Sequence, residues 1–453
     1  MNALDVAEAA VAAAPGGDAL AHVSHERSLL LRFAGNRPTQ ATAIDDVTVE
    51  LAVVFDGHLG RAATNETSPE ALRDCAGRAL GAAEAAATTA PAADHPGFPA
   101  TEPARDHHGY DAETAALDPE AGGAALATTF AAAERHSLEA HGVWTVAEDE
   151  RAVATSAGGG ALDRTTDAMM KVICIAPGGR SGYAAKMSIA GSELDAGSLA
   201  ERAAAKALAP GDNTELPPGE YPIVLEPRAV GSLLELLGDT ALNGLAYAEG
   251  RGALVGRLGE QVAAPAINLA DSPQFPATLP RAIDAEGTAK RPLPLIQDGV
   301  ARGVVHDLRS GALAGVGSTG HALEPGGAPD GPKPTNLVLA GGGAAGLDEL
   351  CAPVERGVYV TRFWYENVVR PRETLVTAVT RDGTFLIEDG RITRPLRNLR
   401  LTDSVLGILA RVEDLTASQE LTSHAEFYAR RFAYGVVSPA LRAGAVRFTD
   451  TTG

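Results

Sequence analysis

A segment rich in proline and glycine divides the chain into two parts of different character. Its sequence, PGDNTELPPGEYP, runs from Pro210 to Pro222, where two prolines and a glycine precede a new apolar run. A chain of 453 residues is also too long for one ordinary hydrophobic core. We therefore predict an N-terminal domain over residues 1–215 and a C-terminal domain over residues 216–453.

Strands and one long helix are expected at the start of the N-terminal domain. The runs SLLLRFA (28–34) and VTVELAVVFDGHLGRAATN (47–65) are strand-like, and the second contains Asp56-Gly57, a strong hairpin-turn dipeptide. An alanine-rich helix follows, with Ser68 as its N-cap and Pro69 at its first helical position. This part therefore reads as strands covered by a helix.

The rest of the N-terminal domain continues this alternation. Residues 88–118 shift to Pro, Ala, Asp and His and are expected to form an exposed irregular connection, in which the tandem His107-His108 is solvated. Helices are predicted from Pro119 to Ala140 and from Ser198 to Leu208, with short strands between them.

The C-terminal domain is expected to consist mainly of strands. A strand-like run from Tyr221 to Pro227 leads into a helix, AVGSLLELLGDTALNG (229–244), and turn signals then recur at short intervals. Glycine is dense between Gly299 and Gly346. The fold class is therefore α+β, with N-terminal α/β-type strands covered by helices and a mainly antiparallel, barrel- or sandwich-like C-terminal domain with few helices.

The charge balance excludes some classes of partner. The chain has 38 basic and 58 acidic residues, a formal charge of −20, which disfavours binding to nucleic acid. No basic leader is present, and no apolar run approaches the roughly 20 residues that span a bilayer, so we expect a cytoplasmic protein without membrane contact. The widely spaced Cys75, Cys174 and Cys351 are expected to be buried thiols.

Two GxGxxG matches raise the possibility of a nucleotide site. The first, Gly315–Gly320, runs into a proline-rich segment that cannot form the required helix. The second, Gly341–Gly346, lies between strand-like runs and has Glu366 about where a ribose ligand is expected. Because Pro353 limits the intervening helix to about two turns, a surface turn is favoured, and an independent nucleotide-dependent enzyme remains the alternative.

Metal and nucleophile motifs are weak. His22 and His25 precede a strand without an acidic partner at ligand spacing, and no helix pairs histidines in an HExxH-like element. The segment GGRSG (178–182) lacks the GxSxG spacing of a nucleophile elbow. The remaining histidines show no pairing: His58, His95, His136, His141, His306, His321 and His424.

Several C-terminal motifs, taken in order, resemble one family. They are IDAEGTAKRPLPLIQDGVARGVVHD (283–307), GSTGHALEPGGAPDGPKPTNLVLAGGG (317–343), LDELCAPVERGVYVTRF (347–363), LRNLRLTDSVLGILARVEDL (396–415) and the closing VVSPALRAGAVRF. Together they cover most of residues 221–453, and the VFDGHLGRAATN hairpin with its following helix gives a looser N-terminal match. This order is similar to that of the TldD/PmbA family, also called modulator of DNA gyrase.

The resemblance implies a subunit of a heterodimeric zinc-dependent hydrolase. In the TldD-type subunit an HExxxH helix and a later cysteine hold zinc, and the TldE/PmbA-type partner has neither. When residues 224–244 are laid on the family's strand and helix, Glu235 and Thr240 fall where the two histidines would be, and Leu236 falls where the glutamate base would be. Zinc hydrolysis needs nitrogen or sulfur ligands and a carboxylate base, so the resemblance implies a metal-free, TldE-type chain.

The function implied is that of a non-catalytic partner. It would pair with a TldD-like chain that carries HExxxH and zinc, and would help to wall a cavity in which that chain cleaves an amide bond of a peptide or small amide. The alanine-rich N-terminal half suggests a specialised member in a natural-product biosynthetic pathway. Carried over as motif positions, the expected cavity residues are Ser318, Thr319, His321, Thr335 and Asn336.

Overall fold

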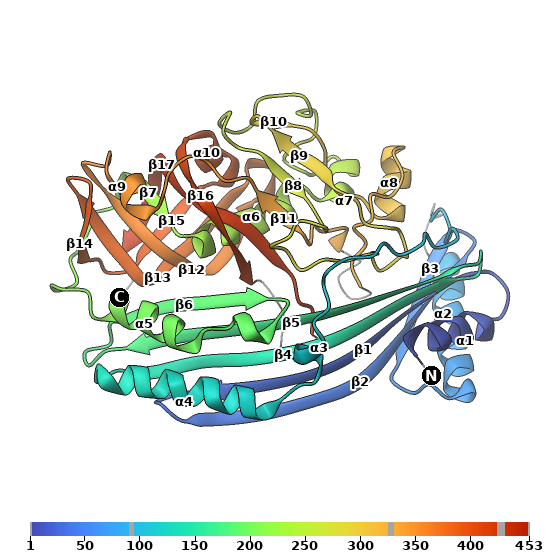
Figure 1. Ribbon diagram of the computed structural model, residues 1–453. Helices are drawn as coiled ribbons and strands as arrows, with labels where there is room; N and C mark the ends of the chain where they lie inside the picture. The colour runs from blue at the N-terminus through green and yellow to red at the C-terminus, as the bar shows by residue number, and fades with distance from the viewer. Residues whose placement is uncertain (1, 90–94, 325–329, 424–430, 452–453) are drawn as a thin grey trace.

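Two large sheets, each built from one half of the chain, form the molecule (Figure 1). The computed structural model describes residues 2–89, 95–324, 330–423 and 431–451. In the view of Figure 1 the C-terminal part lies above the long N-terminal sheet, with α4 and α5 along its front and α1 and α2 at its right-hand end.

The first sheet has six antiparallel strands in the order β3-β2-β1-β4-β5-β6. These strands are β1 (Asp18–Phe33), β2 (Pro38–Phe55), β3 (His58–Thr64), β4 (Glu139–Thr155), β5 (Gly160–Ile175) and β6 (Ser181–Ser188). Its helices are α1 (Ala3–Ala13), α2 (Pro69–Thr89), α3 (Ala112–Ala115), α4 (Pro119–Arg135), the 3-10 turn η1 (Gly191–Glu193) and α5 (Ala196–Ala207).

Side chains along β4 alternate between the two faces of this sheet, and both faces are buried. Trp144 and Val146 pack with α4 and α5, and Ala152 and Ala154 with α1 and α2. The side chains between them point the other way, toward the C-terminal part, because successive residues of a strand face opposite sides. Arg151 is one of these, and it therefore enters the contact between the two halves.

The second sheet has eleven strands and closes on itself. Its strands are β7 (Gly219–Leu225), β8 (Leu269–Asp271), β9 (Leu293–Gln297), β10 (Val300–Ala301), β11 (Leu337–Leu339), β12 (Arg356–Arg370), β13 (Leu375–Glu388), β14 (Arg391–Pro395), β15 (Leu399–Ser404), β16 (Val412–Ser423) and β17 (Gly435–Thr451). Strands β17, β15, β13, β12 and β7 form a closed barrel because β7 pairs with both β12 and β17.

Short helices accompany this barrel. They are α6 (Pro227–Thr240), α7 (Gly244–Ala248), α8 (Leu308–Ala314), α9 (Leu347–Cys351), the 3-10 turn η3 (Pro371–Glu373) and α10 (Val405–Ala410). Helix α6 contributes Leu233, Leu234 and Leu237 to the main C-terminal core. The α+β class and the mainly antiparallel C-terminal half are thus confirmed.

The structure corrects several local expectations. The helix expected from Pro119 to Ala140 ends at Arg135, and β4 begins at Glu139. Helix α1 was not anticipated; the side chain of Asn2 caps it and Asp5 returns a bond to the Asn2 backbone. The connection expected over residues 88–118 contains α3 and buries Phe98, so it is only partly exposed and irregular.

Candidate functional site

Helix α6 presents two acidic side chains on its partly solvent-facing side. Pro227 occupies the first turn, where its missing N–H is not needed, and the leucines of the helix face the core. Glu235 and Asp239 are four residues apart and therefore lie on the same face of the helix. This is the face on which the sequence resemblance places the zinc ligands of related chains.

A lysine fills the space between these two carboxylates. The Nζ atom of Lys333 lies 3.2 Å from Glu235 Oε1 and 3.2 Å from Asp239 Oδ1. It also lies 3.4 Å from the hydroxyl of Tyr434 and 5.2 Å from the centre of that ring, and the Tyr434 hydroxyl donates to Glu235. The segments that precede β11 and β17 are thereby joined to α6.

The lysine is held in its charged form. Burial alone would lower the pKa of Lys333, but Glu235 and Asp239 raise it above its ordinary value. At neutral pH the face of α6 therefore carries a fixed internal cation. A metal cation placed between the same carboxylates would meet the charge of this ammonium group at close range.

The side chains at this face do not suit zinc. Leu236 has no ligand atom and packs against the core, and the hydroxyl of Thr240 donates to the Leu236 carbonyl at 2.7 Å. Cys351 is buried in a separate apolar cluster with Val354 and Phe385. Within the described ranges, no group of three or more His, Cys, Asp or Glu side chains is arranged to hold a metal ion.

The five expected cavity residues mostly surround one buried carboxylate, Asp271. His321 Nε2 lies 3.1 Å from Asp271 Oδ1, and the backbone N–H of Asn336 donates to Asp271 Oδ2 at 2.8 Å. Thr335 donates to the Asn336 side chain, and Thr319 lies 2.9 Å from His321 Nδ1.

Ser318 and the His321 carbonyl make two further contacts. Ser318 instead donates to the His306 carbonyl at 3.4 Å and so braces the turn. The backbone N–H of Lys333 donates to the His321 carbonyl, which connects this network to the face of α6.

A buried cation balances the charge of Asp271. The ammonium of Lys290 lies 3.4 Å from Asp271 Oδ1 and donates to the Gly320 carbonyl. Burial would raise the pKa of Asp271, but Lys290 and His321 together hold it far below its usual range. Burial and the neighbouring Lys290 lower the pKa of His321. The network therefore fixes two loops in place and leaves no ionised base facing solvent.

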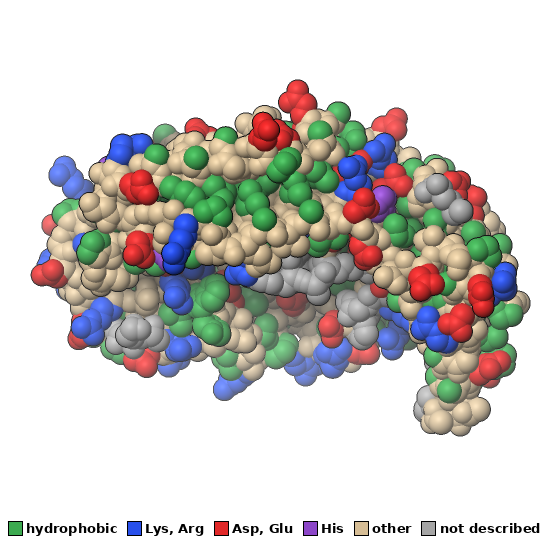
Figure 2. All heavy atoms as spheres, turned by 90° about the horizontal axis from the view of Figure 1, so that it is seen from below, with side chains coloured by type: hydrophobic (Ala, Val, Ile, Leu, Met, Phe, Trp, Pro, Cys, Tyr) green, Lys and Arg blue, Asp and Glu red, His purple; other side chains and the backbone are tan. Residues whose placement is uncertain are grey.

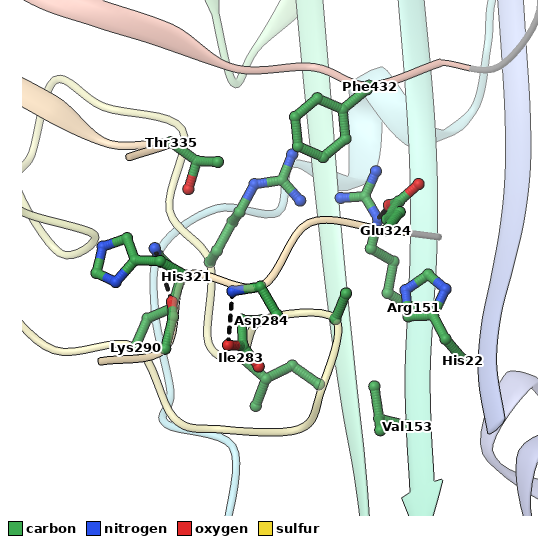
Figure 3. Close-up of a pocket in the computed structure, with 14 residues that line it drawn as sticks. His22, Arg151, Val153, Ile283, Asp284, Lys290, His321, Glu324, Thr335 and Phe432 are labelled. Carbon is green, nitrogen blue, oxygen red and sulfur yellow. Dashed lines mark hydrogen bonds and ion pairs between the residues drawn. The ribbon is translucent and has the colours of Figure 1, made fainter. Parts of the chain in front are cut away.

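His321 and Thr335 line a small cavity between the two halves of the molecule (Figure 3). Arg151 and Val153 reach it from β4 and His22 from β1, while Asp284, Lys290 and Phe432 come from the C-terminal half. Its volume is about 30 Å³, which holds roughly two water molecules. Two of the five expected cavity residues, His321 and Thr335, thus lie at a small cavity between the halves that has no room for a peptide.

Charged side chains hold this seam together. Arg151 pairs with Asp149 of its own strand and with Glu324, whose carboxylate lies 2.7 Å away. The ring of Phe432 lies 5.6 Å from the Arg151 guanidinium and 4.8 Å from that of Arg281. Burial, and then the nearby Arg151, lower the pKa of Arg281 to about 10. Two buried arginines and an aromatic ring therefore lock the halves at this point.

Other histidines behave differently from expectation. The prediction that the tandem His107-His108 is solvated is wrong for His107, whose side chain is 7% exposed and whose Nε2 lies 2.7 Å from Asp163 Oδ1. His22 and His25 are three positions apart on β1, so their side chains point to opposite faces of the sheet and cannot bind the same metal ion. His424 lies outside the described residues.

The two glycine motifs have structural roles. Gly315 ends α8 in a left-handed conformation with φ 71°. Gly342 packs so tightly against β16 that a Cβ would lie 2.6 Å from the Leu415 carbonyl oxygen. Strands β11 and β12 are not neighbours and α9 has five residues, so this segment lacks the strand–helix–strand unit of a dinucleotide site.

The residues that complete both networks were not predicted from the sequence. Lys333, Asp239 and Tyr434 surround Glu235, and Asp271 and Lys290 surround His321. One signal was present: Lys333 stands between two prolines in GPKPTN, so its backbone is held rigidly in an otherwise glycine-rich loop. The carboxylate partners could not be found from spacing, since about a hundred residues separate them from Lys333.

Comparisons with known proteins agree with this architecture. Residues 218–450 match the model of the PmbA/TldA metallopeptidase C-terminal domain, and residues 23–83 match that of PmbA/TldA metallopeptidase domain 1. A metalloprotease TldD homologue from Haemophilus influenzae is 27% identical over 246 residues, 54% of this chain and 50% of the relative. A metalloprotease from Methanothermobacter thermautotrophicus is 26% identical over 198 residues, 44% of this chain and 43% of the relative. The chain thus spans about half the length of the curated relatives that it matches, or less.

Solved structures share the fold over nearly the whole chain. TldE from Thermococcus kodakarensis superposes with a TM-score of 0.84 at 20% identity, covering 98% of this chain and 99% of its own. A protein from Bacteroides thetaiotaomicron described as a putative modulator of DNA gyrase gives 0.81 at 20% identity, with 98% of both chains covered. Within the described residues, no helix has the length and apolar character needed to cross a membrane.

Proposed function

Because the chain belongs to the PmbA/TldD metallopeptidase family, we propose that it is the subunit without a catalytic metal in a two-chain hydrolase. Its partner would be a TldD-like chain that carries the HExxxH helix and binds zinc. This chain would shape the cavity in which the partner cleaves the amide bond of a peptide or small amide. A natural-product biosynthetic pathway is the setting that we propose for it.

One observation carries the proposal: the ammonium of Lys333 lies between Glu235 and Asp239 on the face of α6. A catalytic zinc site needs nitrogen, sulfur or carboxylate ligands and an open position for water. Leu236 has no ligand atom, the hydroxyl of Thr240 donates to the Leu236 carbonyl, and the charged Lys333 lies between Glu235 and Asp239. The acidic side chains of this helix are therefore committed to an internal ion pair.

The likeness to TldE supports the fold and is consistent with the same role. The curated relatives are described as metalloproteases of the TldD kind, and the aligned part reaches only about half of each. The proposal that this chain is the non-catalytic subunit is therefore supported mainly by the residues on α6.

Co-purification with a TldD-like chain from the same genome tests the proposal. The two chains should elute together in size-exclusion chromatography, and amide hydrolysis should require both. Substituting either histidine of the partner's HExxxH motif should abolish activity, while Glu235→Gln in this chain should leave zinc bound in the complex. Hydrolysis by this chain alone, or failure of the two chains to associate, would contradict the proposal.

A further inference from the structure

A large cavity separate from the α6 face opens where the two halves of the molecule meet again. It has a volume of about 730 Å³, within the range of roughly 300–1,000 Å³ typical of small-molecule sites. The turn between β5 and β6, helix α5, strands β12 and β13 and residues 395–400 contribute to its wall. Neither Glu235 and Asp271 nor the side chains described above as contacting them line this cavity.

Positive side chains dominate the wall of this cavity. Five cationic residues line it, and the lining includes one carboxylate, Asp382; the cations are Arg180, Lys206, Arg381, Arg397 and Arg400. The excess of positive charge in the lining is opposite in sign to the formal charge of the whole chain, which is −20. On the face seen in Figure 2, by contrast, acidic and basic side chains are interspersed among small hydrophobic ones. The concentration of cations is therefore a local feature.

Lys206 pairs with Glu226 at 2.7 Å and Arg397 with Glu215 at 3.0 Å, and the single lining carboxylate does not neutralise the three other arginines. Asp382 Oδ2 accepts from Arg362 Nε at 2.7 Å, and Asp382 Oδ1 accepts from the Ser181 hydroxyl at 2.5 Å. Arg381 approaches Asp382 only at 4.0 Å and has a side chain that is 48% exposed. The charge of Asp382 is thus already matched by Arg362, and Arg381 remains available to another anion.

Two further arginines have donors without acceptors. The Nε of Arg180 is buried and has no hydrogen-bond partner among the described residues, while its Nη1 donates to the Gly211 carbonyl. The guanidinium of Arg400 makes no hydrogen bond or ion pair with any residue that the structure describes. Leaving a buried N–H without an acceptor is unfavourable, so a bound anion that accepts from Arg180 would be stabilised.

A distorted part of β12 places two aromatic rings beside this wall. The register of β12 against β13 shifts between Trp364 and Asn367, and Tyr365 has φ 52°. Trp364 is 41% exposed and Tyr365 is 70% exposed. The Trp364 ring lies 5.4 Å from the Arg381 guanidinium and so helps to hold it. Strained bulges of this kind aim side chains at ligands more often than ordinary strand positions do.

We propose that this cavity binds a small organic polyanion through Arg180, Arg381 and Arg400. Its carboxylate or phosphate groups would accept charge-assisted hydrogen bonds from the guanidinium groups, which suit both acids in a two-point geometry. The exposed face of Tyr365 would contact the carbon skeleton of the ligand. This inference does not depend on the proposed pairing with a TldD-like chain.

Calorimetric titration of the full chain with fructose 1,6-bisphosphate and with citrate tests the assignment. At low ionic strength at least one should bind in a one-to-one ratio, and added salt should weaken binding because the contacts are electrostatic. Arg381→Gln and Arg400→Gln should each weaken binding about tenfold or more, the effect of losing one charge-assisted bond.

Arg391→Gln is the matched control. Arg391 is an exposed cation at the start of β14, outside the cavity lining, so this variant should bind like the parent chain. Absence of binding to both small anions would overturn the proposal, as would equal weakening by Arg391→Gln. A hexaglutamate peptide that binds when neither small anion does would also contradict it, by pointing to a peptide ligand instead. Circular dichroism should show that all three variants remain folded.

Discussion

The Nζ atom of Lys333 lies 3.2 Å from the carboxylate of Glu235, and the contact joins residues 98 positions apart in the chain. Both side chains are largely buried, with 18% and 21% of their surfaces exposed. The pair occupies the helix face on which related chains are expected to hold zinc. Its energetic role and its effect on metal binding can be measured separately.

Replacing Lys333 with methionine should destabilise the chain. The change removes the ammonium that lies 3.2 Å from both Glu235 and Asp239, and we expect a loss of about 1–3 kcal/mol in the free energy of unfolding. Urea denaturation monitored by circular dichroism measures it. Lys333→Arg retains the charge and should cost less, whereas an unchanged midpoint for Lys333→Met would mean that the ion pair contributes little.

A cluster of buried acids predicts a pH effect on stability. Burial, with the neighbouring Asp284 and Asp307, raises the pKa of Glu286 well above 4.5, and burial raises the pKa of Asp284 to about 6. Between the ordinary and the raised pKa values the folded chain binds more protons than the unfolded chain. The free energy of unfolding should therefore fall as pH rises from about 4 through 6 and beyond.

Glu286→Gln tests this effect because glutamine cannot ionise. Above pH 6 the variant should be more stable than the parent chain, by on the order of 1 kcal/mol at pH 8. Near pH 4 the two should be similar. Thermal unfolding at a series of pH values would show the difference, and parallel profiles across the whole range would contradict the assignment.

Arg431 should be essential to the contact between the two halves. Its guanidinium Nε donates to Asp167 of β5 at 3.0 Å and its Nη1 to Thr145 of β4 at 2.9 Å, and its backbone N–H donates to Glu26 of β1. Arg431→Met leaves Asp167 buried without its cation and should cost about 3–5 kcal/mol.

A double variant separates this loss from a general packing defect. Arg431→Met combined with Asp167→Leu removes both charges and should recover much of the stability lost in the single variant. Chemical denaturation of the parent chain, the two single variants and the double variant gives the coupling energy. A double variant that is no more stable than Arg431→Met would indicate that the loss does not arise from an uncompensated charge.

Gly60 should be intolerant of any side chain. An added Cβ would lie 2.0 Å from the carbonyl oxygen of Ala79 on α2, so Gly60→Ala must push this helix off the sheet, at a cost of at least about 2 kcal/mol. Gly77, exposed on the same helix, meets nothing within 4 Å, and Gly77→Ala should stabilise by about 0.5–1 kcal/mol. Thermal melts should move in opposite directions; a shared direction would be inconsistent with the packing described.

Local signals in the sequence predicted local structure well. Asp56-Gly57 forms the turn between β2 and β3, with both residues at positive φ, and Pro69 begins α2 as expected. These elements depend on a few neighbouring residues, whose conformational preferences are visible in the sequence. The helix around Glu235 was predicted for the same reason, from its leucine pattern.

Features that depend on distant contacts could not be predicted in this way. His107 lies in a segment that reads as solvated, yet it is buried because Asp163, 56 positions away, accepts its hydrogen bond. Likewise, the cation beside Glu235 comes from a loop near β11, and no spacing rule connects the two. The resemblance located the candidate helix, but only the structure revealed what lies against it.

The zinc content of the purified full chain tests the central claim most directly. After incubation with excess zinc and removal of the free ion by gel filtration, elemental analysis should find only trace zinc in this chain, since Lys333 fills the place between Glu235 and Asp239. Stoichiometric zinc that is lost in Glu235→Gln would contradict the account and would make the α6 face a metal site after all.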